Sequence, residues 1–326
     1  MNDEISALLH LCASNLDQRE HWLNLSQAFY EKRDYLSGYW AAKQALAIKE
    51  TADDKNLSYP YDLAGTCAYY IRMYDEARDL SLEAWRKAPF DKRIILNTKL
   101  MRRHLNDYKI HILWPTVRPK IFKERYKEWQ EKACLKDRIK LKIAVNTEEQ
   151  REELNEFPDV KIIGTNQPGV AYASYMLSKD LLGLPDDIVI LASDDFSPPK
   201  DWDAWIYDKL NGFHGALLVN DTVNREGVIT IPIMDYACLL FTNKIIYHPS
   251  YVHLWSDNEY YNNLNYLGLI KNLQQPDQPV FEHRHWYQGK REKDEIDENA
   301  HKNMDRDQRN YEARIRLSFE QKICQI

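Results

Sequence analysis

The sequence of 326 residues has no long apolar run, and none of its apolar stretches approaches the roughly 20 residues that a helix needs to cross a bilayer. Its N-terminal stretch places acidic side chains before a short apolar patch, which is the wrong polarity for a secretory signal. We therefore expect a chain without a membrane span that works in the cytoplasm.

Cysteine and excess positive charge are scarce too. The five cysteines are scattered and no two form a C-x-x-C pair, which predicts reduced thiols and neither a disulfide framework nor a zinc site. The net charge of -6 gives no overall electrostatic reason to bind nucleic acid or an anionic membrane. The sequence also lacks the two glycine-rich motifs that bind phosphate groups, G-x-x-x-x-G-K-[ST] and G-x-G-x-x-G. A P-loop nucleotide site is excluded, and a dinucleotide oxidoreductase is disfavoured.

Residues 1–108 combine helical spacing of apolar residues with recurring alanines and few prolines, which predicts an all-α region. Two stretches in it align at a spacing of 39 residues. The aligned positions are Trp22, Leu25, Ser26, Phe29, Gly38, Ala42 and Ala45 with Tyr61, Ala64, Gly65, Ala68, Ala77, Ser81 and Ala84. This pattern resembles the tetratricopeptide repeat (TPR), which uses small residues where two helices touch. A packing or dimerisation module and a groove for a protein partner are both compatible with it.

From Lys109 onward, short β-branched apolar runs alternate with helical stretches, which predicts a mostly parallel, doubly wound α/β sheet covered on both faces. The runs expected as strands are KIHILW, IKLKIAV, VKIIG, DIVILA, GALLVN, VITIPI and YACLLF, the later ones with room for antiparallel pairing. The basic segment Arg118–Lys142 is expected to be a solvated helix face, with contact to a polyanion such as DNA as the alternative.

The stretch DIVILASDDFSPPKDWD ends an apolar run on two adjacent carboxylates, Asp194 and Asp195. Ligands of such sheets bind at the carboxyl ends of strands, where this pair is placed. Adjacent like charges are costly to bury without a cation, and a divalent cation shared with substrate phosphates is a natural partner. The pair therefore predicts a clamp for a diphosphate. A turn that caps the next helix is the structural alternative.

The region from Lys109 to Lys293 resembles GT-A glycosyltransferases, especially the family-2-like branch of phage and bacterial genomes. The motifs that carry the resemblance occur in order as HILWPTVRP, TNQPGVAYASYML, LASDDFSPPKDWD, YHPSYVHLWSDNEYYNNL and PVFEHRHWYQGKREKDE. The resemblance implies a nucleotide-sugar site made by Pro115, Thr116, Arg118, Asn146, Asn166 and Asp194. It implies that Asp195 binds Mn²⁺ or Mg²⁺, together with His283 or His285.

The same resemblance implies a catalytic carboxylate near the start of a helix. Asp257 or Glu259 is expected to take the proton of the acceptor hydroxyl, with a helix cap as the structural alternative. The sequence departs from the family in two places. VNTEE lacks the aspartate that reads uracil, so that Asn146 is the candidate substitute and the donor base stays open. The acidic motif reads Ser-Asp-Asp, with Ser193 where relatives carry an acid.

We therefore expect a metal-dependent glycosyltransferase that moves a sugar, with inversion, from a nucleoside-diphosphate donor (UDP by resemblance) to a hydroxyl of a glycan, a protein or modified DNA. Transfer to hydroxylated DNA bases, nucleotidyl transfer and a non-catalytic repeat scaffold are the alternatives. The expected domains are a TPR-like region at 1–108, which could also mediate self-association, a GT-A domain at 109–289 and a charged helical extension at 290–326. A phage origin would place the enzyme in the host cytoplasm.

Overall fold

The structure is a computed structural model that describes residues 3–49, 56–103, 107–165, 169–223, 226–284, 289, 292–293 and 295–323. The chain forms two compact units, Met1–Asp107 and Tyr108–Ile326. Each unit is considered by itself. No helix in the described ranges is both long enough and apolar enough to pass through a membrane.

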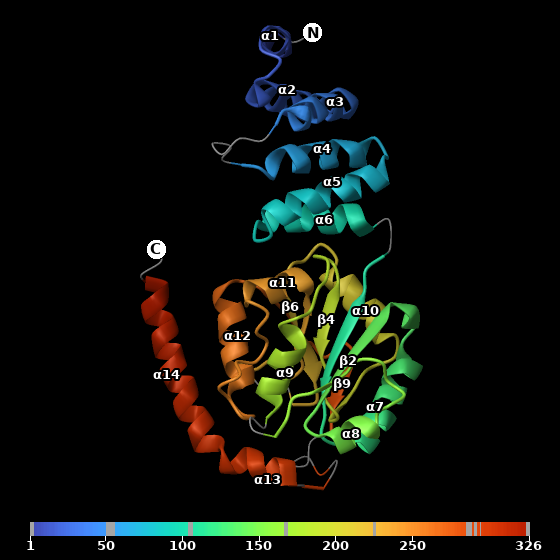
Figure 1. The fold of residues 1–326 in the computed structure, drawn as a ribbon, viewed down its shortest axis with the longest axis vertical. Helices are drawn as coiled ribbons and strands as arrows, with labels where there is room; N and C mark the ends of the chain where they lie inside the picture. The colour runs from blue at the N-terminus through green and yellow to red at the C-terminus, as the bar shows by residue number, and fades with distance from the viewer. Residues whose placement is uncertain are drawn as a thin grey trace. The chain divides into compact units, whose positions relative to one another are not determined.

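The first unit consists of helices, as the sequence predicts (Figure 1). Each helix packs on the next along the chain. The helices are α1 (Asp3–Ser14), α2 (Arg19–Glu31), α3 (Tyr35–Ala47), α4 (Tyr59–Tyr70), α5 (Tyr74–Lys87) and α6 (Lys92–Arg103). The pairs α2–α3 and α4–α5 correspond to the two copies of the sequence repeat, and residues 50–55 between them lie outside the described residues.

The repeat is confirmed by equivalent contacts in both helix pairs. A Cβ atom on Gly38 of α3 would lie 3.3 Å from the carbonyl oxygen of Ser26 on α2, and one on Gly65 of α4 would lie 3.3 Å from the carbonyl oxygen of Ala77 on α5. These four residues are the small positions aligned in the sequence. The turns repeat as well, because Arg33 and Arg72 both have a positive φ, 61° and 65°.

The second unit is built on a mixed sheet. Its strands run in the order β3-β2-β1-β4-β7-β6-β9-β5, and β8 pairs with β6. The strands are β1 (Ile110–Pro115), β2 (Ile139–Val145), β3 (Val160–Ile162), β4 (Ile188–Leu191), β5 (Phe196–Ser197), β6 (Ala216–Asp221), β7 (Ile233–Asp235), β8 (Ile270–Leu273) and β9 (Val280–His283). The first four are mutually parallel, whereas β7 runs antiparallel to both β4 and β6. The predicted sheet of mainly parallel strands is thus confirmed.

Helices cover the sheet on both faces (Figure 1). Ile112 and Trp114 of β1 pack with Phe122 and Trp129 of α7, while α9 contacts β1 and β2. The helical segments of the unit are α7 (Pro119–Lys132), the 3-10 turn η1 (Lys136–Arg138), α8 (Glu148–Glu152), α9 (Val170–Ser178), α10 (Trp202–Leu210), α11 (Tyr236–Phe241), α12 (Ser256–Tyr266), α13 (Glu295–Lys302) and α14 (Met304–Ile323).

Two expected strands differ in the structure. In the run VITIPI only the last residue, Ile233, belongs to a strand, because β7 begins there. The run YACLLF forms α11, which starts directly after β7. The side chain of Asp235 accepts a hydrogen bond from the backbone N–H of Cys238 at 2.7 Å and so caps the first turn. The run is apolar and buried at most positions, and such a run has no periodicity that separates helix from strand. The cap decides the outcome.

Candidate functional site

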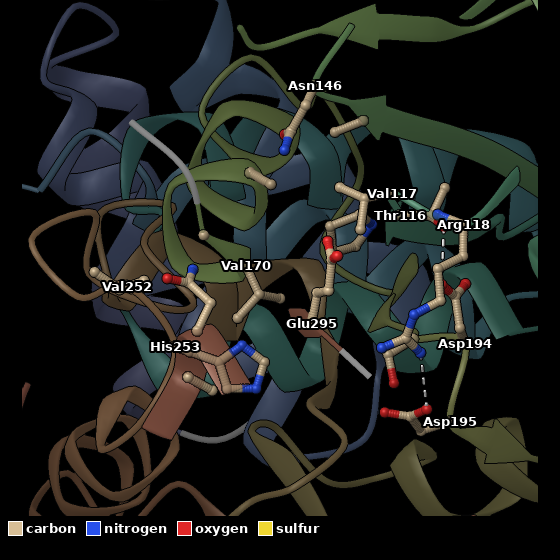
Figure 2. A pocket seen from close by; sticks show the side chains of 17 residues that line it. Thr116, Val117, Arg118, Asn146, Val170, Asp194, Asp195, Val252, His253 and Glu295 are labelled. Atoms are coloured by element: carbon tan, nitrogen blue, oxygen red, sulfur yellow. Dashed lines mark hydrogen bonds and ion pairs between the residues drawn. The ribbon is translucent and has the colours of Figure 1, made fainter. Parts of the chain in front are cut away.

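A pocket of about 310 Å³ lies at the carboxyl ends of β1, β2 and β4. Strand β1 has β2 on one side and β4 on the other, so the order of strands along the chain reverses here. In open α/β sheets, ligands bind in the crevice at such a reversal. Its lining residues are Pro115, Thr116, Val117, Arg118, Ala144, Asn146, Gly169, Val170, Ala173, Ser193, Asp194, Asp195, Val252, His253, Glu295, Asn299 and Ala300 (Figure 2).

The structure brings together most of the residues expected to bind the nucleotide sugar. Pro115, Thr116 and Arg118 come from the end of β1, Asn146 follows β2, and the acidic pair follows β4. Asn166 and His285 lie outside the described residues. The residues meet because parallel strands end at the same edge of a sheet.

Asp194 is held in place by the end of β1. Its two carboxylate oxygens accept hydrogen bonds from the indole N–H of Trp114 at 2.9 Å and from the hydroxyl of Thr116 at 2.8 Å. The backbone N–H of Arg118 donates in turn to the hydroxyl oxygen of Thr116 at 3.0 Å. Desolvation raises the pKa of Asp194 to about 6, although these hydrogen bonds and the charge of Arg118 oppose the shift.

Arg118 supplies the positive charge that the acidic pair requires. Its guanidinium lies 3.4 Å from a carboxylate oxygen of Asp195 (Figure 2). The side chains of Arg118 and Asp195 are 14% and 22% exposed, so the pair lies at the wall of the pocket and can still be reached by a ligand. A guanidinium with several N–H donors in a fixed fork is well suited to a phosphate.

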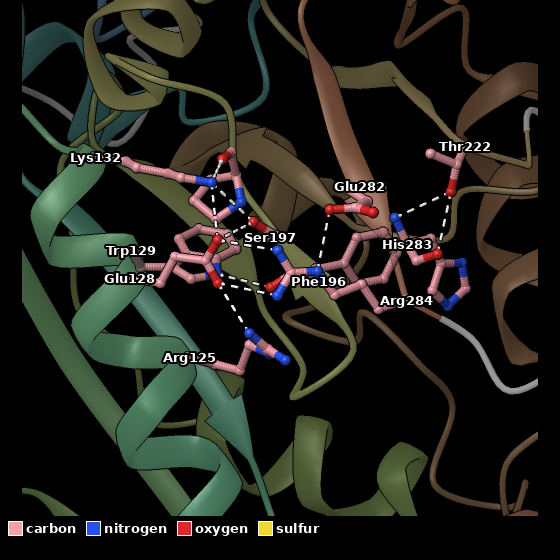
Figure 3. Close-up of polar contacts among 11 residues, drawn as sticks. Arg125, Glu128, Trp129, Lys132, Phe196, Ser197, Thr222, Glu282, His283 and Arg284 are labelled. Carbon is pink, nitrogen blue, oxygen red and sulfur yellow. Dashed lines mark hydrogen bonds and ion pairs between the residues drawn. The ribbon is translucent and has the colours of Figure 1, made fainter. Parts of the chain in front are cut away.

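A polar network around Glu128 and Arg284 joins α7, β5 and the end of β9 (Figure 3). The carbonyl oxygen of Asp195 accepts a hydrogen bond of 2.7 Å from the backbone N–H of Arg284, directly after β9. The side chain of Arg284 is bound by the carboxylate of Glu128 on α7, at 3.2 and 3.4 Å. Glu128 also accepts hydrogen bonds from Ser197 of β5 and from Lys132, four residues further along α7.

Glu128 is ionised over the whole physiological range. Its burial opposes ionisation, but the hydrogen bonds from Ser197 and Lys132 and the charges of Lys132 and Arg284 outweigh burial and lower its pKa to about 2. A permanent negative charge on α7 therefore contacts Ser197 of β5, just after Asp195, and Arg284, whose backbone N–H binds the carbonyl oxygen of Asp195.

Gly169 brings α9 close to the loop before α12. Its φ is +143°, and a Cβ atom there would lie 2.1 Å from the carbonyl oxygen of Val252. Only glycine allows this backbone contact. The first turn of α9 consequently reaches the pocket wall, where free N–H groups of a helix favour an anion.

The sequence did not point to the residues of the opposite wall. His253 lies in the loop before α12 and Glu295 on α13 (Figure 2). Asn299 lines the pocket from the same helix as Glu295. Burial lowers the pKa of His253, although the carboxylates of Asp195, Asp297 and Asp307 oppose the shift. The imidazole is therefore neutral at pH 7 and can accept a proton. The segment that contains Glu295 and Asn299 is simply rich in charged residues, and no motif in it marks residues that line a pocket.

The structure does not bring the expected catalytic carboxylates to the pocket, so a catalytic role for Asp257 or Glu259 stays a prediction. Glu259 is buried and accepts hydrogen bonds from Tyr251 at 2.6 Å and from Arg314 at 2.7 and 2.8 Å. Burial works against ionisation, yet the bonds from Arg314 and Tyr251 lower its pKa. Both of its carboxylate oxygens bind Arg314 of α14. Asp257 does not line the pocket either.

His283 has a structural environment. Its ring stacks on Phe196 with centroids 4.3 Å apart, its backbone pairs with Thr222, and it does not line the pocket (Figure 3). The role of metal ligand that the resemblance implied for His283 or His285 therefore stays a prediction. On a strand the next residue of the same face is His285, which lies outside the described residues.

The described residues include no group of three or more His, Cys, Asp or Glu side chains able to hold a metal ion by themselves. Mg²⁺ commonly takes only one or two protein carboxylates, and substrate phosphates and water complete its shell. Asp195 at the pocket wall fits such a shared cation. The residues present thus suit a divalent ion bound together with a phosphate ligand, not a cage built by protein alone.

No protein-family model matches the sequence, and no curated protein matches it. Solved structures have similar folds over parts of the chain. The mannosyltransferase PcManGT from Pyrobaculum calidifontis, solved with GDP-Man and Mn²⁺, aligns with 70% of this chain and 68% of its own, at 12% identity and a TM-score of 0.42. TarS 1-349 from S. aureus, solved with UDP-GlcNAc, aligns with 54% of this chain and 59% of its own, at 16% identity and a TM-score of 0.41.

The helical unit has similar structures too. The TPR domain of Arabidopsis OM64 aligns with 31% of this chain and 78% of its own, at 21% identity and a TM-score of 0.27. The chain spans less than two thirds of the TarS structure. The topology described above, rather than these likenesses, establishes the GT-A-like sheet and the TPR-like helices that the sequence resemblance implied.

Proposed function

We propose that the pocket binds the nucleoside-diphosphate part of a sugar donor and that the second unit transfers the sugar to an acceptor hydroxyl. The observation that carries the proposal is the joining of Arg118 with the paired carboxylates Asp194 and Asp195 in a pocket at the strand reversal. A guanidinium, two acids and a hydroxyl at this place suit a diphosphate with its cation.

Each residue has a part in this proposal. Arg118 and Thr116 bind the diphosphate or ribose, and Asn146 after β2 lies on the side of the base. Asp195 holds the cation and Asp194 accepts a hydrogen bond from a hydroxyl of the donor. Mn²⁺ or Mg²⁺, when bound, would neutralise charge on the departing diphosphate. UDP is the nucleotide that we expect from the sequence.

Transfer forms a bond between the acceptor oxygen and the anomeric carbon, and breaks the bond from that carbon to the diphosphate oxygen. The diphosphate leaves with the electron pair, and the acceptor proton passes to a base. We assign the base to His253 because it lines the pocket and is neutral, whereas Glu259 is tied to Arg314. A base on the face opposite the leaving group would give inversion.

The proposal also assigns a role to each part of the chain. Residues 109–289 carry the transfer, 290–326 complete the pocket, and 1–108 bind a protein partner or a second copy. The acceptor is a glycan, a protein or modified DNA, and the site of action is the cytoplasm. Acceptor screening with the donor that binds will separate these classes.

The test compares Asp195→Asn with the unaltered chain and with Asp208→Asn, a control on α10 whose carboxylate is 71% exposed. We expect Mn²⁺-dependent thermal stabilisation by one sugar nucleotide, its loss in Asp195→Asn, and a transfer rate lowered at least about 100-fold, since second-sphere changes alone cost 10–100-fold. Release of nucleoside diphosphate supports sugar transfer, whereas release of pyrophosphate indicates nucleotidyl transfer. No binding of any sugar nucleotide, or an unchanged Asp195→Asn variant, would refute the proposal.

A further inference from the structure

The pocket has two chemically different walls. The wall at the strand ends carries a guanidinium, two acids and a hydroxyl. The wall opposite is made by the loop before α12 and by α13, and its polar side chains are His253, Glu295 and Asn299. With a carboxylate and no Lys or Arg among its described residues, this second wall repels a phosphate. It suits a ligand that is rich in hydroxyl groups.

Glu295 and Asn299 form one recognition face. They stand four residues apart on α13, so both project from the same side of the helix. The carboxylate of Glu295 has no hydrogen-bond or ion-pair partner among the described residues, and the amide of Asn299 receives one hydrogen bond, at 3.2 Å from Asn303. An acceptor-only carboxylate beside an amide that both donates and accepts can bind neighbouring hydroxyls.

The buried carboxylate of Asp307 holds α14, and with it α13, against the pocket. It is fully buried and accepts three backbone N–H groups, from Val252 at 3.0 Å, His253 at 2.9 Å and Leu254 at 3.0 Å. Successive N–H groups of this kind form a cavity for an anion. The same contact therefore orients His253 and anchors the helix pair.

Further along α14, two side chains continue the attachment to α12 and to Trp255 just before it. Arg314 binds both oxygens of Glu259. The hydroxyl of Tyr311 receives a hydrogen bond from Asn262 at 2.7 Å, and its ring stacks on Trp255 at 5.3 Å. These contacts, with Asp307, attach α14 at several points, which is what a wall of a binding site requires.

We propose that Glu295 and Asn299 on α13 bind the hydroxyl groups of the transferred sugar and determine which sugar is accepted. The inference rests on the proposed function, because it assigns the sugar half of the donor to the wall that faces the diphosphate half. The C-terminal helix pair is thereby part of the binding site.

The experiment measures binding of UDP-glucose, UDP-N-acetylglucosamine and GDP-mannose, each against UDP or GDP alone, by calorimetry at fixed Mn²⁺. The variants are Glu295→Gln and Asn299→Ala, with Glu298→Gln as the control, because Glu298 lies on the same helix but does not line the pocket. We expect the sugar nucleotide that binds the unaltered chain to bind each variant about tenfold more weakly, since a lost hydrogen bond to a charged group has about this effect. The affinity for the nucleoside diphosphate alone stays unchanged, and Glu298→Gln behaves like the unaltered chain.

The outcomes separate the two proposals. If the unaltered chain binds no sugar nucleotide, the proposed function falls and this inference with it. If it binds one and the variants bind it equally well, only the inference is overturned. An equal loss of affinity for UDP or GDP alone also overturns it, because the helix would then contact the ribose. Circular dichroism shows that each variant is folded.

Discussion

Replacing Asp307 by asparagine tests whether one buried carboxylate fixes the loop that carries His253. In the structure, one oxygen accepts the N–H of Val252 and the other accepts those of His253 and Leu254. An asparagine keeps only one accepting oxygen. Even in its better orientation it loses the bond from Val252 and leaves that N–H facing an NH₂ group.

The magnitude follows from these contacts. A hydrogen bond to a charged group contributes about 1.5–3 kcal/mol, and an unsatisfied buried N–H costs about 1–3 kcal/mol. A net loss of roughly 2–4 kcal/mol in the free energy of local opening corresponds to amide exchange that is roughly 30- to 1,000-fold faster. Deuterium exchange of peptides that cover residues 250–256 measures it directly, under conditions in which the rest of the unit stays protected.

The control is Asp305→Asn. Asp305 lies in the same first turn of α14 but is exposed. Both variants remove a carboxylate that favours the helix N-terminus, so that effect cancels in the comparison. Equal exchange rates of the Val252–Leu254 amides in the two variants would show that Asp307 does not hold the loop.

Two other perturbations test the framework of the site. Glu128→Gln removes a carboxylate whose pKa of about 2 lies below its ordinary value of 4.5. Because the folded state favours the ionised group, the carboxylate stabilises the fold above pH 4.5, and this contribution is lost as the pH falls towards 2. We expect a loss of about 1 kcal/mol at pH 7, allowing for partial exposure, and a flatter acid limb in urea titrations from pH 7 to 3, whereas the exposed control Glu131→Gln keeps the original profile. Gly169→Ala should lower the free energy of unfolding by more than the ~1–2 kcal/mol of an alanine with positive φ, because its Cβ atom would meet the carbonyl group of Val252. The control Gly164→Ala, at φ +76° with nothing within 4 Å, should lower it by only that amount. Equal losses in chemical denaturation would contradict the close contact at Gly169.

Much of the site could be predicted because its residues follow strands. Alternating β-branched runs and helices indicate a parallel sheet, and parallel strands end at one edge, which places Thr116, Asn146 and Asp194 together. The need for a counter-charge near the acidic pair also followed from the residues, and Arg118 provides it. The site residues themselves await the experiments above.

Other features could not be predicted, because local sequence does not contain them. The run Tyr236–Phe241 has the composition of a strand, and the cap by Asp235 makes it a helix. Glu259 has the position of a catalytic carboxylate at a helix start, but a contact with Arg314, 55 residues further on, occupies both oxygens. Such a contact depends on where α14 lies, and no periodicity encodes that.

The sequence by itself determined the helical repeat, the mostly parallel sheet and the strand edge at which Thr116, Asn146 and the acidic pair lie. It did so because propensity, pattern and short-range spacing are local properties. Only the tertiary structure decided which groups face the pocket. Glu259 and Asp307 are buried against residues far away in the sequence and attach α14 to the rest of the unit. His253, Glu295 and Asn299 line the pocket instead.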